Sequence, residues 1–264
     1  MQNLGRGVQS IEVSGKILAV LSSRATSMML KDISVESGLT PGQAHAYLVS
    51  LRRLGLVEKD AGGTQYKLGP FALQIGLTRL RNSDPFEQVW ETLPELTAKM
   101  NLSMTMSIWS QNGPVIIRYN EAPYQIYANV RPGSHYSLLD TATGKVFAAY
   151  LKPKLFLPLL NMEISERFDR GQRAAQTNLY LEKIAAVREA GYAIAVGEPI
   201  PGIDAISVPI FEFSGNLIAA ITAIGPEGSI DLRENGITKF EMLRYAQVIS
   251  EKLGGFMVQT GSDG

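Results

Sequence analysis

Two short amphipathic runs joined by a glycine lie near the N-terminus. LKDISVES (30–37) continues through Gly38-Leu39 into TPGQAHAYLVSLRR (40–53). Thr40 can cap the second run, and Pro41 suits the first helical position because its missing N–H would have no intrahelical partner there. Two short helices with a glycine in the turn between them predict a helix-turn-helix, whose second helix enters the major groove of DNA.

The flanking segments complete a winged helix-turn-helix. Residues 8–23 place Ile11, Leu18 and Leu21 near one helical stripe, with Ser10 as a candidate cap. Residues 55–69 predict two short strands, 56–59 and 65–68, around an Ala-Gly-Gly turn, which is the pattern of a hairpin. Three helices closed by such a hairpin make a winged module.

The net charge differs between the N-terminal part and the remainder of the chain, although the whole chain is neutral. Residues 1–80 hold nine Lys or Arg against five Asp or Glu, a net charge of +4. The remainder holds sixteen against twenty, a net charge of −4. A mildly basic N-terminal module fits DNA binding, and the acidic remainder fits another role.

After the winged module, residues 70–82 predict a linker helix, with Leu73, Leu77 and Leu80 at helical spacing. A helix over 85–100 follows, which Pro94 would kink. The rest alternates between strands and helices, with short turns between several strands. The strands are expected at 104–110, 113–121, 124–131, 191–199, 204–211 and 216–225. Residues 139–151 are expected to form a loop and then a helix, with Asp140 or Thr141 as cap. Further helices are expected at 153–160, 177–190 and 233–254. The fold class is therefore α+β with a largely antiparallel sheet.

Several classes of protein are disfavoured by what the sequence lacks. It has no Cys, no apolar run of about 18 residues and no signal peptide, so we expect a cytoplasmic protein without a membrane span. Gly144-Lys145 resembles the end of a phosphate loop, but Leu139 and Val146 stand where that loop needs Gly and Ser or Thr. Only two His are present, and no GxSxG, HExxH or GxGxxG motif occurs. We predict no catalytic residue, no metal and no cofactor.

The second helix of the helix-turn-helix has two distinct faces. Ala44, Leu48 and Leu51 point together and form the expected core stripe. The opposite side presents Gly42, Gln43, His45, Ala46, Val49, Ser50 and Arg53. Gln43 is well placed to pair with an adenine edge. The alternative is a winged module that has lost DNA contact and only mediates protein association.

Four segments, in this order, resemble the IclR family of bacterial transcription regulators. VQSIEVSGKILAVL (8–21) resembles the family's first helix, and residues 30–70 resemble its helix-turn-helix and wing. SLLDTATGKVFAAYL (137–151) resembles its loop-helix motif PLHATAxGKAxLA. Residues 191–226 resemble its closing strands, with the pattern GYA…GE…G…AIAAPI…G…AAxSxxGP. The similarity spans about residues 8–250, which is nearly the full chain.

This resemblance implies a transcription factor that binds double-stranded operator DNA as a homodimer or homotetramer. It implies a winged helix-turn-helix over 1–69, a linker helix over 70–82 and a GAF-like effector-binding domain over 83–264. The effector would be a small molecule, an organic acid or an aromatic catabolite. The residues that match the effector site are Thr141, Ala142, Thr143, Gly144, Ala195, Ala205, Thr222 and Ile224. The expected DNA-binding residues are Thr40, Gly42, Gln43, His45, Ala46, Ser50, Arg52, Arg53, Lys59 and Lys67.

The departures from the family pattern change what is expected of the two sites. Ala46 stands where the family usually has Arg, so we expect phosphate contacts from the two arginines and the two lysines just named, and base reading from Gln43. Asp140 follows the position of the family's His and places a carboxylate near a possible anion site. Unless Asp140 faces away, neutral, amine-bearing or aromatic effectors are favoured. Glu198 is expected in a solvated loop or, alternatively, at the edge of the effector pocket.

Two other functions stay open from the sequence. The first is a GAF-like enzyme or ligand-binding protein whose winged helix serves protein association. The second is a DNA-bound structural regulator without a ligand, which would have a filled effector domain.

Overall fold

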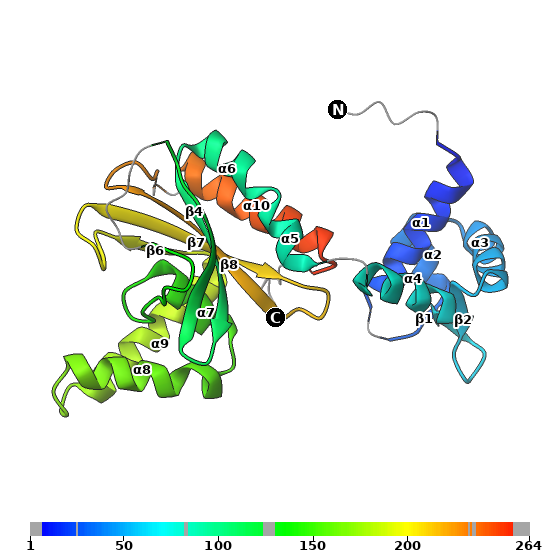
Figure 1. Ribbon diagram of the computed structural model, residues 1–264. Coiled ribbons are helices and arrows are strands. Elements are labelled where there is room, and N and C mark those ends of the chain that lie inside the picture. The colour runs from blue at the N-terminus through cyan, green and yellow to red at the C-terminus, as the bar shows by residue number, and fades with distance from the viewer. Residues whose placement is uncertain are drawn as a thin grey trace. The chain divides into compact units, whose positions relative to one another are not determined.

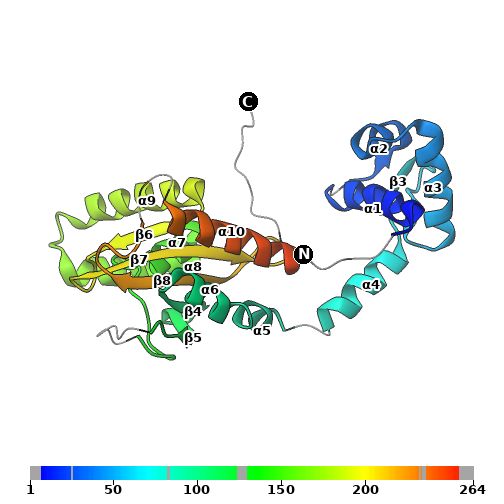
Figure 2. The ribbon, with the colours of Figure 1, turned by 90° about the horizontal axis from the view of Figure 1, so that it is seen from above.

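The computed structural model describes residues 7–24, 26–81, 84–123, 130–231, 233 and 236–255, and it divides the chain into two compact units, Met1–Asp84 and Pro85–Gly264. Figure 1 and Figure 2 show the two units, the first in blue to cyan and the second in green to red. Among the helices so described, none is both long and apolar enough to cross a membrane.

The first unit is a winged helix-turn-helix. Its helices are α1 (Gln9–Ser22), α2 (Leu30–Ser37), α3 (Pro41–Arg53) and α4 (Pro70–Arg81). Its strands are β1 (Met28–Met29), β2 (Val57–Lys59) and β3 (Gln65–Leu68), in the order β1-β3-β2. The three helices and the hairpin were all expected. Strand β1 was missed because two residues are too short for an alternating pattern to be visible.

The core of this unit confirms the expected stripe of α3. Ala44, Leu48 and Leu51 are buried, and Leu48 and Leu51 pack with residues of α1, α2 and the hairpin. Two expectations for α1 were wrong. Ile11 is 70% exposed, and α1 begins after Val8 without a side-chain cap, so Ser10 is not the cap.

The second unit is built around a five-stranded antiparallel sheet in the order β5-β4-β8-β7-β6. The strands are β4 (Ser103–Ser110), β5 (Gly113–Asn120), β6 (Ala193–Val196), β7 (Ile203–Phe211) and β8 (Leu217–Pro226). Helices α5 (Pro85–Trp90), α6 (Leu93–Met100) and α10 (Ile237–Lys252) lie on one face of the sheet. Helices α7 (Ala142–Tyr150), α8 (Pro153–Arg167) and α9 (Arg173–Ala190) lie on the other (Figure 1). This is the predicted α+β class.

The structure corrects some of the predicted boundaries. Residues 85–100 form two helices rather than one kinked helix, and Pro94 stands in the first turn of the second, where its missing N–H costs nothing. Helix α8 runs through Pro158 to Arg167, beyond the end predicted at residue 160. Most of the strand expected at 124–131 lies outside the described residues.

Candidate functional site

The face of α3 that points away from the core is exposed and carries little charge. All ten residues expected to contact DNA are exposed. Lys59 and Lys67 belong to the hairpin, and the others belong to α3 or cap its start. Arg52 and Arg53 line a groove together with Val49 of α3 and the residues of β2. The volume of this groove is 380 Å³. No hydrogen bond or ion pair joins either guanidinium to another of the described residues. These two arginines are therefore available to phosphate groups.

The lysines of the hairpin are less available. Lys67 Nζ lies 3.1 Å from a carboxylate oxygen of Glu58. Lys59 Nζ donates to the carbonyl oxygen of Gly63 at 2.7 Å and lies 5.5 Å from the centre of the Tyr66 ring. An exposed ion pair of this kind is weak, at about 0–1 kcal/mol, so Lys67 can exchange Glu58 for a phosphate.

In the second unit, the start of α7 is held by close packing and a side-chain cap. Thr141 Oγ1 accepts the N–H of Gly144 at 2.9 Å and donates to the carbonyl oxygen of Ser137 at 2.6 Å. A Cβ at residue 144 would lie only 2.6 Å from Leu138 Cα and would clash with the Ser137 carbonyl. Gly144 is therefore required because the loop before α7 passes directly over the first turn of that helix. Thr141, rather than Asp140, is the cap.

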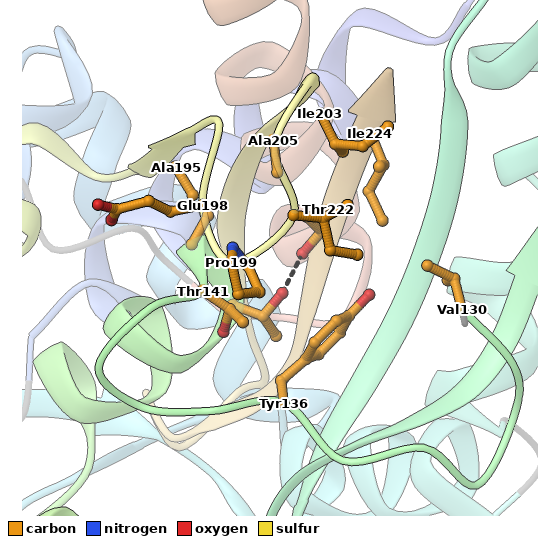
Figure 3. A pocket seen from close by; sticks show the side chains of 13 residues that line it. Val130, Tyr136, Thr141, Ala195, Glu198, Pro199, Ile203, Ala205, Thr222 and Ile224 are labelled. Atoms are coloured by element: carbon orange, nitrogen blue, oxygen red, sulfur yellow. Dashed lines mark hydrogen bonds between the residues drawn. The ribbon is translucent and has the colours of Figure 1, made fainter. Parts of the chain in front are cut away.

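A pocket lies between this helix start and the sheet (Figure 3). Its volume is 60 Å³, and it is mostly apolar. Seven of the eight residues expected to bind an effector line it: Thr141, Ala142, Thr143, Ala195, Ala205, Thr222 and Ile224. Gly144 does not line the pocket, since it packs under the loop instead.

Hydroxyl groups form the floor of the pocket. In the sheet, Thr222 of β8 is directly paired with Ser207 of β7 on one side and with Thr105 of β4 on the other. Thr222 Oγ1 donates to Ser207 Oγ at 2.9 Å and lies 2.7 Å from Thr143 Oγ1 of α7. Tyr136 extends its hydroxyl toward this floor and lies 3.3 Å from Thr105 Oγ1 (Figure 3). Burial raises the pKa of Tyr136 to about 12, so this phenol remains a hydrogen-bond donor at neutral pH.

A glutamate from α8 fixes the loop that precedes α7. The carboxylate of Glu163 accepts hydrogen bonds from the Ser137 hydroxyl at 2.7 Å and from the N–H groups of Leu138 and Leu139 at 2.9 and 3.1 Å. From α9, the Tyr180 hydroxyl donates to the Leu138 carbonyl at 2.8 Å. Helices α8 and α9 thus position the start of α7, although neither helix lines the pocket itself.

Asp140 faces away from the pocket. Its carboxylate pairs with Arg167 of α8 at 2.6 Å, and one of its oxygens lies 3.2 Å from the Ser137 hydroxyl oxygen. Burial raises the pKa of Asp140, but the Arg167 hydrogen bond and charge outweigh it, so the pKa lies below its ordinary value. Because this negative charge is paired and outside the pocket lining, it gives no reason to disfavour an anionic effector.

Sequence reasoning did not place several residues of the pocket wall: Val130, Tyr136, Pro199, Ile200 and Ile203. Glu198 also lines the pocket, which agrees with the expected alternative that it lies at the pocket edge. Its carboxylate is directed away from Thr222 and Tyr136 (Figure 3). The alternation of β7 could have indicated Ile203, two positions before Ala205. The other wall residues come from irregular segments, whose course no periodic pattern reveals.

Comparisons with known proteins agree with this two-part organisation. Residues 78–251 match the family model "Bacterial transcriptional regulator IclR C-terminal", and residues 10–61 match "IclR helix-turn-helix domain". The chain is 27% identical over 256 residues to the glycerol operon regulatory protein of Streptomyces coelicolor, covering 95% of this chain and 98% of that protein. It is 25% identical to the HTH-type transcriptional regulator XynR of Escherichia coli, covering 94% and 98% respectively.

Solved structures give the same result for the fold. The crystal structure of Pseudomonas aeruginosa HmgR superposes with a TM-score of 0.77 at 28% identity, covering 94% of this chain and 99% of that chain. The Agobacterium tumefaciens repressor BlcR gives a TM-score of 0.71 at 22% identity, covering 95% and 99%. The curated relatives are regulatory proteins, not enzymes, which removes the enzyme alternative. The chain belongs to the IclR family and is a DNA-binding transcriptional regulator.

Proposed function

We propose that a homodimer of this chain binds operator DNA through α3 and the β2–β3 hairpin, and that a small organic acid in the pocket beside α7 modulates this binding. The observation that carries the proposal is the pocket itself, because its polar groups converge from α7, the loop before it and the centre of the sheet. A ligand there contacts elements that are otherwise separate, so it can change their relative positions.

The DNA side of the proposal rests on the exposed face of α3. Arg52 and Arg53 would contact phosphates, with Lys59 and Lys67 of the hairpin as further anchors. Gln43 would read a base edge, with help from His45 or Ser50. Gly42 and Ala46 have no side-chain donor, so they would allow close approach of the helix to the groove without adding affinity.

The effector class follows from the chemistry of the pocket. The N–H groups of Ala142 and Thr143 begin α7, where unpaired amides and the helix dipole favour an anion. The Tyr136 hydroxyl can donate to the same ligand. With the negative charge of Asp140 paired elsewhere, these donors suit a carboxylate, and the apolar wall suits a short carbon chain.

The volume of the pocket limits the size of the effector. A buried water needs about 10–15 Å³ on this scale, so 60 Å³ holds about four to six water-sized groups. A carboxylic acid of two to four carbon atoms fits, whereas an aromatic catabolite would require the pocket to widen. We therefore favour a small acid over the aromatic class.

Helix α4 supports a homodimer. Leu73 and Leu77 are 64% and 48% exposed, and Phe71 and Ile75 on the same helix are 43% and 50% exposed. So many exposed apolar side chains on one helix indicate a protein contact surface. A second copy satisfies this surface and supplies the second recognition helix that a palindromic operator needs. Light scattering of the full chain should give a dimer or a multiple of it, and replacing Leu73 and Leu77 by Ser should lower that mass.

A gel-shift titration on the DNA upstream of the chain's own gene tests the DNA contacts. We expect binding that weakens steeply as salt rises, and a loss of affinity when Gln43→Ala and Arg53→Ala are combined. Salt-insensitive binding, or an unchanged affinity of the double variant, would refute the placement of α3 in the groove.

A further inference from the structure

Gln43 has a second role that restricts how it can contact DNA. It is the third residue of α3, and its side chain closes a capping box with Thr40. The Thr40 N–H donates to Gln43 Oε1 at 3.0 Å, and the Thr40 hydroxyl donates to the same oxygen at 3.0 Å. The Gln43 N–H in turn donates to Thr40 Oγ1 at 3.3 Å.

These contacts determine the orientation of the Gln43 amide. A backbone N–H can only donate, so the amide must turn its oxygen, not its nitrogen, toward Thr40. That oxygen has two lone pairs, and the two Thr40 donors use both. Nε2 has two hydrogens and no hydrogen-bond partner among the described residues. Gln43 is exposed and therefore offers donors, but no free acceptor, to a partner.

The major-groove edges of the bases differ in what they require. Adenine presents the N7 acceptor beside the N6 amino donor, so a glutamine that reads it needs both a free donor and a free acceptor. Guanine presents two acceptors, N7 and O6, and cytosine presents only a donor. From this geometry we propose that Gln43 selects guanine in the operator, not the adenine that its residue type suggested.

The capping box strengthens this selection. Reading adenine would require Gln43 to release at least one of the two Thr40 donors at the first turn of the recognition helix, where N–H groups lack intrahelical partners. Reading guanine leaves the box intact. Thymine offers a single acceptor, O4, and is the next best base. The inference depends on the proposed placement of α3 in the major groove, so its test must separate the two.

Selection of binding sites from a random duplex library with the full-length chain provides that test. Gln43→Ala removes the amide, and Gln43→Glu keeps an acceptor for the capping box, since Glu is a usual residue at its third position, but has no donor. Gln9→Glu, at an exposed position of α1, is the control for the added negative charge. Circular dichroism melting curves should show that Gln43→Glu folds like the wild type.

We expect one position of the selected sequence to be guanine with the wild type and with Gln9→Glu, and to lose this preference for guanine with both Gln43 variants. In a duplex with adenine at that position, the wild-type affinity should fall about tenfold, and the affinity of Gln43→Ala should change much less. Adenine at the Gln43-dependent position, or the absence of such a position in an otherwise defined sequence, would overturn this inference alone. Failure to select any sequence would overturn the placement of α3 as well.

Discussion

Replacing Glu163 by Gln tests whether α8 positions the start of α7. The carboxylate accepts three hydrogen bonds from the loop before α7, two of them from backbone N–H groups. Glutamine has one oxygen, so at least one N–H must lose its acceptor, and the Leu138 side of the loop is fully buried. The substitution changes no volume, so its effect isolates these bonds.

The size of the effect follows from the bonds that are lost. A hydrogen bond to a charged group contributes about 1.5–3 kcal/mol, and a buried donor without a partner costs about 1–3 kcal/mol. We expect Glu163→Gln to destabilise the second unit by about 2–4 kcal/mol. For a domain of this size each kcal/mol shifts the melting midpoint by about 2–4 °C, so the midpoint should fall by about 4–16 °C.

Tryptophan fluorescence can measure this unit alone. The chain has two Trp, Trp90 and Trp109, and both lie in the second unit. Trp109 also contacts Phe147 of α7, with ring centres 5.8 Å apart. Glu166→Gln is the matched control, because Glu166 is exposed on the same helix. Equal midpoints for the two variants would refute the positioning role of Glu163.

Three further substitutions have defined outcomes. Gly144→Ala should lower the melting midpoint measured by Trp fluorescence, because its Cβ meets the loop backbone. A midpoint equal to that of the wild type would contradict that close approach. Ala46→Arg should strengthen operator binding and steepen its salt dependence by about one phosphate contact in an anisotropy titration, unless this face lies outside the groove. Asp140 has a lowered pKa, so its pairing with Arg167 stabilises the fold above pH ~4 and is lost as pH falls through the folded pKa. Asp140→Asn should therefore weaken the fall in the free energy of unfolding as the pH is lowered into the acid range. An unchanged pH dependence would show that the pair contributes nothing.

The winged module and the order of elements were predictable because each has a local pattern. The cap and proline at the start of α3, its stripe of Ala44, Leu48 and Leu51, and the turn of the hairpin are all encoded within a few residues. The residues around the pocket were reached through resemblance to the family, and the structure brings most of them together.

Long-range contacts could not be predicted in the same way. Nothing near Asp140 in the sequence indicates that it turns toward Arg167, 27 residues later. Likewise, residue type alone suggested that Gln43 reads adenine, whereas its bonds to Thr40 depend on the geometry of the helix start. The chemistry of both sites therefore depends on which hydrogen-bonding groups are already used within the protein.

The coupling between pocket and operator is the central claim, and one anisotropy titration tests it most directly. A selected operator duplex is titrated with the wild type and with Ala205→Leu, whose side chain would occupy the pocket, in the presence of acetate, propionate or lactate. The account predicts that at least one acid changes the wild-type affinity by about fivefold or more and leaves Ala205→Leu unaffected. No response to any of these acids, or an equal response of both proteins, would contradict it.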